Sequence, residues 1–268
     1  MALFIHPHTE SLLTATSRSL PHGLLLSGPR GLGLSTLVSY LLGQSGIALK
    51  AQVIEPDDKG TISIDAIRVL YQQTRTKHAA RVIVIKDSDR MTIAAQNAFL
   101  KLLEEPNPGL HFILTSHVPH RMLATILSRV QHVTARRLTS QQTQQFLQEQ
   151  GIVDAARIAQ LQFIAEGLPA ALTELLQDEA TFRAKAQIVR DAREFLQGEG
   201  YDRLLLLHKY STDRTKAVLL LQSAMHILSI TLEKNPQPAM IDQLHRLLEA
   251  EDRIHENGHV RTQLLRTL

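Results

Sequence analysis

The stretch Gly28-Pro-Arg-Gly-Leu-Gly-Leu-Ser35 decides the fold, because it joins a short apolar run to an apolar helical pattern. Leu24–Leu26 precede it, and the residues from Leu37 to Leu42 follow it with helical spacing. The spacing matches the frame G-x-x-x-x-G-K-[ST] of a phosphate-binding loop between a strand and a helix. Taken alone, this frame is weak evidence, because glycine-rich turns between strands and helices are common.

The lysine of that frame is missing. Gly28, Gly33 and Ser35 occupy the two glycine positions and the hydroxyl position, whereas Leu34 stands where the lysine belongs. In working loops the lysine reaches the β- and γ-phosphates and the hydroxyl binds Mg²⁺. Leucine does neither, so the loop is either a structural turn or the remains of a nucleotide site.

The composition excludes several classes of function. The 268 residues contain no cysteine, which excludes disulfides, thiolate nucleophiles and cysteine-bound zinc. Aromatic residues make up only 4%, so stacking on bases is not expected to be a main device. The net charge of +3 permits contact with nucleic acid without arguing for it. We see neither a signal-peptide pattern nor a run of 18 apolar residues, and therefore expect a cytoplasmic protein.

Up to about residue 137, short apolar runs alternate with amphipathic segments. This alternation predicts an α/β domain with a parallel sheet that is buried on both faces. The expected strands are Leu24–Leu26, Val82–Ile85, Phe112–Leu114 and Val130–Val133. The expected helices are Ser35–Gly43, Ser63–Lys77 and Thr92–Glu105, the last with Thr92 as its N-cap and Pro106 as its stop.

Beyond Thr139 the strand signal disappears, and we expect helices throughout. The expected helices are Ser140–Gln150, Asp154–Gly167, Pro169–Gln177, Thr181–Gln197, Asp202–Leu207, Asp213–Lys234, Pro238–Asn257 and His259–Leu268.

A second motif, Arg81-Val-Ile-Val-Ile-Lys-Asp-Ser-Asp-Arg-Met91, has the outline of a Walker B strand. Such a strand ends in an acid that holds Mg²⁺ and a second acid that orients the attacking water. Lys86 takes the first position and Asp87 the second. A lysine cannot bind a cation, so this segment taken alone favours a buried strand with a polar end.

Two further motifs follow. Phe112-Ile-Leu-Thr-Ser-His117 is an apolar strand with a polar end, and Leu123-Ala-Thr-Ile-Leu-Ser-Arg-Val130 is an amphipathic segment. By themselves they indicate no more than a strand and a helix that ends in a solvated arginine, Arg129.

The order of these motifs resembles the clamp-loader branch of the AAA+ family. Between the Walker B strand and the later motifs lies Asn97-Ala-Phe-Leu-Lys-Leu-Leu-Glu-Glu-Pro106, and Ser128-Arg129-Val130 stands where those subunits carry Ser-Arg-Cys. By this resemblance Thr115 is the sensor-1 position. Gly167-Leu-Pro-Ala-Ala-Leu172 matches the lid segment, in which Ala170 replaces the sensor-2 arginine.

The resemblance covers about residues 5–175 and implies three parts. They are an AAA+ RecA-like core over 1–137, a small helical lid over 138–178 and an all-α collar for oligomerisation over 179–268. Family members usually carry a four-cysteine zinc module after the first loop helix. Here only a short connection runs from Gly43 to Ile62, so we expect neither the module nor zinc.

The resemblance further implies a subunit that hydrolyses no ATP itself and helps load a sliding clamp onto primed DNA. Leu34, Lys86 and Ala170 together remove the phosphate lysine, the metal-site acid and the sensor arginine, so no bound nucleotide or metal is expected. Arg129, aimed by Ser128, would act in trans as an arginine finger on a neighbour's ATP site. The implied partners are the gamma/tau and delta subunits, with the clamp and primer-template DNA contacted through the complex.

Other interpretations stay open. Arg90 and Lys101 lie where clamp loaders face their central chamber, so they are either DNA phosphate contacts or ordinary solvated helix charges. The chain could also be an unorthodox AAA+ ATPase that acts in helicase loading or DNA repair, or a stand-alone scaffold that binds DNA.

Overall fold

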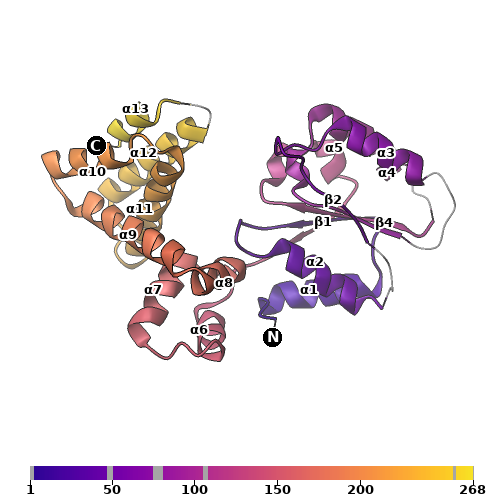
Figure 1. The fold of residues 1–268 in the computed structure, drawn as a ribbon, viewed down its shortest axis with the longest axis horizontal. Helices are drawn as coiled ribbons and strands as arrows, with labels where there is room; N and C mark the ends of the chain where they lie inside the picture. The colour runs from indigo at the N-terminus through magenta and orange to yellow at the C-terminus, as the bar shows by residue number, and fades with distance from the viewer. Residues whose placement is uncertain (1–2, 47–50, 75–80, 105–107, 256–257, 268) are drawn as a thin grey trace. The chain divides into compact units, whose positions relative to one another are not determined.

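The computed structural model describes residues 3–46, 51–74, 81–104, 108–255 and 258–267. The chain forms two compact units, residues 1–173 and 174–268 (Figure 1). The first unit runs through the predicted core and through most of the predicted lid. The three-part division of the chain stays a prediction.

The first unit is built on a five-stranded sheet in which all neighbouring strands are parallel, in the order β2-β3-β4-β1-β5. The strands are β1 (Gly23–Ser27), β2 (Gln52–Ile54), β3 (Arg81–Ile85), β4 (Leu110–Ser116) and β5 (Gln131–Thr134). All five residues of β1 are buried, as expected for a central strand that is covered on both faces. The predicted α/β fold class is confirmed.

Helices cover both faces of this sheet. On one face lie α1 (Pro7–Arg18) and α2 (Leu34–Gln44), and on the other lie α3 (Ile64–Thr74), α4 (Ile93–Glu104) and the short α5 (Ala124–Leu127) (Figure 1). Two 3₁₀ turns, η1 (Ser88–Arg90) and η2 (Pro119–Arg121), follow β3 and β4. The sheet therefore separates two apolar clusters, one beneath each helical layer.

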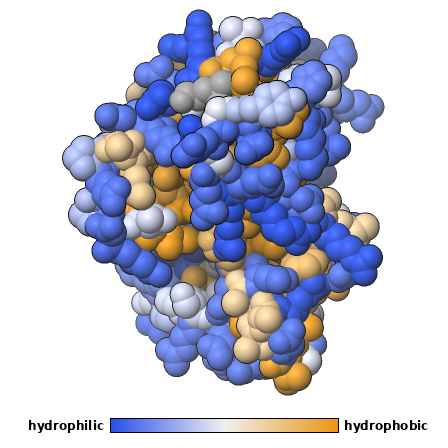
Figure 2. Space-filling view, turned by 90° about the vertical axis from the view of Figure 1, so that its left-hand side faces the viewer, coloured by the Kyte–Doolittle hydropathy of each residue, from blue (hydrophilic) through white to orange (hydrophobic). Residues whose placement is uncertain are grey.

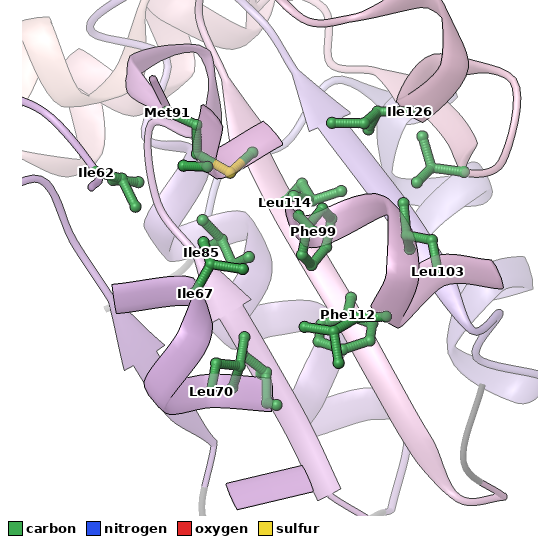
Figure 3. Packing of buried hydrophobic residues seen from close by; sticks show 14 of the residues in the cluster. Ile62, Ile67, Leu70, Ile85, Met91, Phe99, Leu103, Phe112, Leu114 and Ile126 are labelled. Carbon is green, nitrogen blue, oxygen red and sulfur yellow. The ribbon is translucent and has the colours of Figure 1, made fainter. Parts of the chain in front are cut away.

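Two phenylalanines pack against each other within the cluster under α3 and α4. Phe99 of α4 and Phe112 of β4 are fully buried, and their rings meet edge to face with centroids 5.1 Å apart (Figure 3). Such pairs contribute roughly 0.5–1.5 kcal/mol beyond their buried area. This packing joins α4 to β4 within the cluster.

Helices α6 (Ser140–Glu149) and α7 (Ala155–Ala165) belong to the first unit. The boundary between the two units falls within α8 (Pro169–Gln177). Thr139 and Gln142 form a reciprocal capping box at the start of α6. After α7 the chain turns through Glu166 and Gly167, which have φ of 51° and 74°. A Cβ on Gly167 would lie 2.5 Å from the carbonyl oxygen of Leu138, so only glycine allows this close approach.

The second unit is all-α, with α9 (Glu179–Gln197), α10 (Gly200–Tyr210), α11 (Arg214–Lys234), α12 (Pro238–His255) and α13 (Val260–Leu265). Asp178 and Asp213 are the N-caps of α9 and α11. Hydrogen bonds from Thr181 lower the pKa of Asp178, and those from Lys216 lower the pKa of Asp213. By length and composition α11 alone among the described helices could span a membrane, but it packs against α9 and α12 in this unit's core, which makes that indication weak.

The predicted elements differ from the observed ones mainly at their ends. Helix α10 is longer than the predicted Asp202–Leu207, and α13 is shorter than the predicted His259–Leu268. Thr92 caps α4 as expected, since its hydroxyl accepts a hydrogen bond from the N–H of Ala95 at 3.2 Å. Four predicted helix ends or stops lie outside the described residues: Lys77, Glu105 with Pro106, Asn257 and Leu268.

Candidate functional site

The glycine-rich loop joins β1 to α2, in the predicted strand–loop–helix arrangement. Gly31 and Gly33 have φ of 82° and 87°, which lies in the left-handed region that glycine adopts without strain. Gly33 is the N-cap of α2 and offers no side chain to the first turn. Ser35 is exposed in that turn. The loop thus turns tightly at two glycines and leads into the N-terminus of α2.

Its side chains are apolar where a working loop is charged. Leu34, in the lysine position, is 4% exposed and belongs to the cluster under α1 and α2. A Cβ placed on Gly28 would lie 3.4 Å from side-chain atoms of both Leu32 and Leu34, so these two leucines converge on the first frame glycine. Leu34 therefore packs into the core instead of reaching towards a phosphate.

At the position predicted for the first Walker B acid stands a lysine, which forms an ion pair with a glutamate next to β2. Lys86 follows β3, and its Nζ lies 2.5 Å from Oε1 of Glu55, which follows the edge strand β2. The backbone N–H of Lys86 donates to Ile54 at 2.9 Å, which extends the β2–β3 pairing by one residue. No carboxylate stands at this position to hold Mg²⁺, so the residue set does not fit a magnesium nucleotide.

The next residue, Asp87, is held in an unusual backbone conformation. It has φ of 47°, and its N–H donates to the hydroxyl of Thr115 at 3.1 Å. Thr115 is only 2% exposed, and its carbonyl accepts a hydrogen bond from the Ser88 hydroxyl at 2.9 Å. Thr115, predicted to be the sensor-1 position, thus stabilises the turn after β3.

A histidine joins this turn to the glycine-rich loop. His117 lies just after β4, and its Nδ1–H donates to the carbonyl of Gly28 at 2.8 Å. Its Nε2 lies 3.5 Å from Oδ1 of Asp87. The same strand end is tied to η1, because Oδ1 of the buried Asp89 accepts from the Ser116 hydroxyl at 2.7 Å and from the His117 N–H at 3.1 Å. The chain's own side chains therefore cross-link the loop, β3 and β4.

The segment predicted to belong to the lid contacts the loop through the backbone. The carbonyl of Gly31 accepts hydrogen bonds from the N–H groups of Ala170 at 2.9 Å and Ala171 at 3.1 Å, in the first turn of α8. A Cβ on Gly31 would lie 3.1 Å from that of Ala171. Ala170, predicted to be the sensor-2 position, thus contributes a backbone contact to the loop and no charge.

Arg129 lies near the N-terminal end of β1, away from the loop. It follows α5, its guanidinium Nη2 lies 2.9 Å from Oε1 of Glu104, the last residue of α4, and its Nη1 donates to the carbonyl of Thr125 at 3.0 Å. The Ser128 hydroxyl donates to the same carbonyl at 3.1 Å and accepts from Arg129 at 3.4 Å. The side chain of Arg129 stays 39% exposed.

The distance from Arg129 to the loop follows from the strands. The carbonyl oxygen of Arg129 lies 3.5 Å from a Cβ placed on Gly23, the first residue of β1, whereas the glycine-rich loop follows Ser27, the last. A five-residue strand spans about 15 Å. Arg129 and the loop of the same chain therefore lie near opposite ends of β1.

The two expected DNA-contact residues differ in their surroundings. The Nη1 of Arg90 donates to the carbonyl of Gly60 at 3.2 Å, and the side chain is half-buried against that turn. Lys101 is exposed on α4. The structure thus ties Arg90 to its own chain and leaves Lys101 as the more accessible cation.

Of the predicted residues, the structure brings Gly28, Leu34, Asp87, Thr115 and Ala170 together around the loop. It holds Ser128 and Arg129 together near the opposite end of β1 and pairs Lys86 with Glu55. Three partners escaped sequence reasoning, namely His117, Asp89 and Glu104. The sequence offers only their position as a signal, since His117 and Asp89 stand among the polar residues that follow two predicted strands. Within the described ranges, no cluster of three or more His, Asp or Glu side chains could hold a metal ion.

A family model described as DNA polymerase III, delta subunit, matches residues 44–139. The DNA polymerase III subunit delta' of Bacillus subtilis is 24% identical over 245 residues, which cover 81% of this chain and 74% of that protein. The delta' subunit of Escherichia coli is 30% identical over 47% of this chain and 46% of that protein. The tau subunit of B. subtilis is 31% identical over 50% of this chain, but this chain spans only 28% of its length.

Solved structures show the same fold. A gamma subunit-related protein from Thermotoga maritima superposes with a TM-score of 0.54 at 19% identity, over 97% of this chain and 96% of that one. The RuvB Holliday junction branch migration motor of T. maritima superposes with a TM-score of 0.53 at 14% identity, over 98% and 88%. At these identities the likeness concerns the fold alone. The family model and the sequence relatives confirm the resemblance to AAA+ clamp-loader subunits, and the solved structures confirm the fold.

Proposed function

We propose that this chain, a relative of the AAA+ clamp-loader subunits of DNA polymerase III, is a delta-prime-like subunit that hydrolyses no ATP. In this role it helps load the sliding clamp onto primed DNA in the cytoplasm and supplies an arginine finger to a neighbouring ATPase subunit.

One observation carries the proposal. Leu34, Lys86 and Ala170 stand where the phosphate lysine, the metal-binding acid and the sensor-2 arginine are expected, whereas an exposed arginine stands near the other end of β1. Leu34 is packed into the core, Lys86 is paired with Glu55, and Arg129 lies one strand length away from the loop. An arginine in that place cannot serve the loop of its own chain, and so it fits a role in trans.

The proposed chemistry is electrostatic. In the transition state of phosphoryl transfer, charge spreads over the oxygens of the γ-phosphoryl group, and an arginine supplied by a neighbour stabilises it. In the best-studied GTPases such fingers raise the rate by roughly 10³–10⁵. The guanidinium is always charged and forms bidentate hydrogen bonds, both of which suit phosphate oxygens. Ser128, which accepts a hydrogen bond from Arg129, helps to aim it.

Glu104 gives this finger a resting position. In the isolated chain the guanidinium of Arg129 is paired with Glu104. Exposed ion pairs of this kind are worth about 0–1 kcal/mol, so exchange of the carboxylate for a neighbour's phosphate costs little. The pair therefore holds the side chain near its working place without locking it there.

The proposed partners are the gamma/tau and delta subunits, and the clamp and primer-template DNA are met through their complex. Lys101 is the better candidate for a salt-sensitive phosphate contact with DNA, because Arg90 already bonds to Gly60. The all-α second unit is the proposed collar. No zinc and no nucleotide of its own enter this mechanism.

The assembly experiment mixes the purified full-length chain with gamma/tau-type and delta-type subunits, followed by size-exclusion chromatography and ATP turnover measurements. The proposal predicts one complex that contains this chain, turnover by the complex, and no turnover by the chain alone. Intrinsic turnover by the chain would favour an unorthodox AAA+ ATPase in helicase loading or repair. Failure to enter the complex would contradict the clamp-loader role.

A further inference from the structure

A histidine directly before β1 connects the start of β4 to the last turn of α4. His22 is half-buried, and its ring packs edge to face against that of Phe112, with centroids 5.4 Å apart. Its Nδ1 lies 2.8 Å from the carbonyl oxygen of Leu110, and its Nε2 lies 3.2 Å from the carbonyl oxygen of Leu102. The two ring nitrogens of one side chain thus face two different elements.

These two contacts need separate donors on the ring. A carbonyl oxygen only accepts hydrogen bonds, so each contact is a bond only where the facing nitrogen carries a proton. A neutral imidazole has one N–H, and the protonated ring has two. Leu102 lies in the last turn of α4, whose carbonyls have no partner within the helix, and histidine side chains bond such carbonyls. A proton on Nε2 therefore makes His22 a side-chain cap of the α4 C-terminus.

The next residue, Gly23, lies against both segments that adjoin the proposed finger. A Cβ placed on Gly23 would lie 2.9 Å from Cγ1 of Val130 and 3.5 Å from the carbonyl oxygen of Arg129. It would also lie 3.3 Å from Cδ2 of Leu103, in the last turn of α4 (Figure 3). Because close-packed interiors transmit displacements, a shift of this turn moves the backbone of Arg129 as well.

The last turn of α4 meets Arg129 a second time, through Glu104. Oε1 of Glu104 lies 2.9 Å from Nη2 of Arg129. Removal of the Glu104 charge leaves Leu103 in place, whereas loss of the bond to Leu102 frees the whole turn. A misplacement of about 1 Å at a catalytic group can cost about 10²-fold in rate. The bond from His22 thus bears on the position of the guanidinium.

We infer that His22 is a positioning residue for the proposed finger. The hydrogen bond from its Nε2–H to the carbonyl of Leu102 fixes the last turn of α4, and this turn places Arg129. The contact of Nδ1 with Leu110 joins the entry of β1 to β4 and has no part in this role. The inference rests on the proposed function of Arg129 in trans.

Two substitutions separate the two bonds. The side-chain amide of Asn reaches about as far as Nδ1, and that of Gln about as far as Nε2, so His22→Asn keeps a donor for Leu110 and His22→Gln keeps one for Leu102. At the ATP site that adjoins this chain in the reconstituted complex, we expect turnover to fall about tenfold in His22→Asn and to stay within about threefold of the parent in His22→Gln. Hydrogen exchange of residues 101–104 in the free chain is expected to accelerate in His22→Asn and much less in His22→Gln.

The matched control is His111→Asn. His111 is another half-buried histidine, on β4, and its Nδ1 lies 3.0 Å from the carbonyl oxygen of Pro21. Turnover and the exchange of residues 101–104 are expected to stay unchanged in this variant. Every variant is expected to enter the complex, because His22 and His111 belong to the first unit. The proposed collar is the second unit, and apolar side chains reach the surface among hydrophilic ones on the side where its α10 lies (Figure 2).

Three results would overturn the inference. One is a loss of turnover in His22→Gln with parent-like turnover in His22→Asn, which would assign the role to the bond with Leu110. Another is an equal loss in both variants, which would show a merely structural role. The third is parent-like exchange of residues 101–104 in His22→Asn, which is measured without any partner.

Arg129→Ala distinguishes a failure of this inference from a failure of the proposed function. Unchanged turnover in Arg129→Ala would reject the finger and the positioning role together. A loss of turnover in Arg129→Ala with parent-like turnover in His22→Asn would reject the positioning role alone. The expected result is a loss in both of these variants, with recovery in His22→Gln.

Discussion

The guanidinium of Arg129 lies 2.9 Å from Oε1 of Glu104, although the two residues come from different helical segments at the N-terminal edge of the sheet. The two side chains are 39% and 49% exposed. Because the pair is solvated, its contribution to stability is small, about 0–1 kcal/mol. The pair orients the proposed finger in the free chain, and a neighbour's phosphate can replace the carboxylate.

Glu104→Gln tests this view of the pair. We expect the free energy of unfolding to change by less than about 1 kcal/mol, measured by urea denaturation. ATP turnover of the reconstituted complex is expected to stay within about fivefold of the parent value. A much larger loss of turnover would mean that Glu104, and not Arg129 alone, is required at the neighbouring site.

Leu34→Lys restores the missing lysine and is expected to harm the protein. The variant places an ammonium group in an apolar cluster and removes the packing of a leucine that is 4% exposed. The expected loss is about 2–4 kcal/mol in the free energy of unfolding. Leu34→Met, which conserves volume, is the control and should lose less than about 1.5 kcal/mol. We also expect no ATP turnover, because Lys86 still replaces the metal-binding acid; a gain of turnover would refute this.

His117→Ala is expected to loosen the glycine-rich loop. The substitution removes the hydrogen bond to the Gly28 carbonyl and the contact with Asp87. Hydrogen exchange of residues 28–33 should accelerate, with a stability loss of about 1–2 kcal/mol. His120→Ala, at an exposed position three residues away, is the control. If the hydrogen exchange of the loop were unchanged in His117→Ala, the hydrogen bond from His117 would not stabilise the loop.

Asp191 makes the second unit sensitive to acid. Burial alone would raise the pKa of this carboxyl, but hydrogen bonds from Lys209, Tyr210 and Gln187 outweigh it and lower the pKa. A lowered folded-state pKa stabilises the protein above the unfolded pKa of about 3.9, and this stabilisation disappears as the pH falls below that value.

Asp191→Asn is therefore expected to cost about 2 kcal/mol or more at pH 7, and to lose less additional stability than the parent chain on acidification below about pH 4. Urea denaturation followed by circular dichroism across that range measures both effects. The exposed Asp202→Asn is the control. If the free energy of unfolding fell by the same amount below about pH 4 in Asp191→Asn and in the parent, Asp191 would not be the source of the acid sensitivity.

The sequence predicts the central strands because they are buried on both faces. Leu24–Leu26 and Val82–Ile85 are continuous apolar runs, which is the pattern of a covered parallel sheet. The edge strand β2 was missed, because Gln52–Ile54 is short and only partly buried. Helix α1 was missed too, since Pro7–Arg18 is mostly polar and only four of its residues are buried.

The candidate site was only partly predictable, for a physical reason. Local patterns locate the glycine-rich loop, Asp87, Thr115 and Arg129, because motifs are contiguous in sequence. They do not reveal which side chains meet across the sheet edge. His117 reaches a carbonyl 89 positions earlier, and Glu104 pairs with a residue 25 positions later. Such pairings depend on strand order and helix ends, which no single segment encodes.

The most direct test of the central claim is ATP turnover at the site that adjoins this chain. It uses a reconstituted complex in which every other ATP site is inactivated, with primed DNA and clamp present. For Arg129→Ala we predict a fall on the order of 10³-fold with the assembled complex intact, whereas Arg68→Ala, at another exposed arginine, leaves turnover unchanged. Unchanged turnover by an intact complex that contains Arg129→Ala would contradict the account.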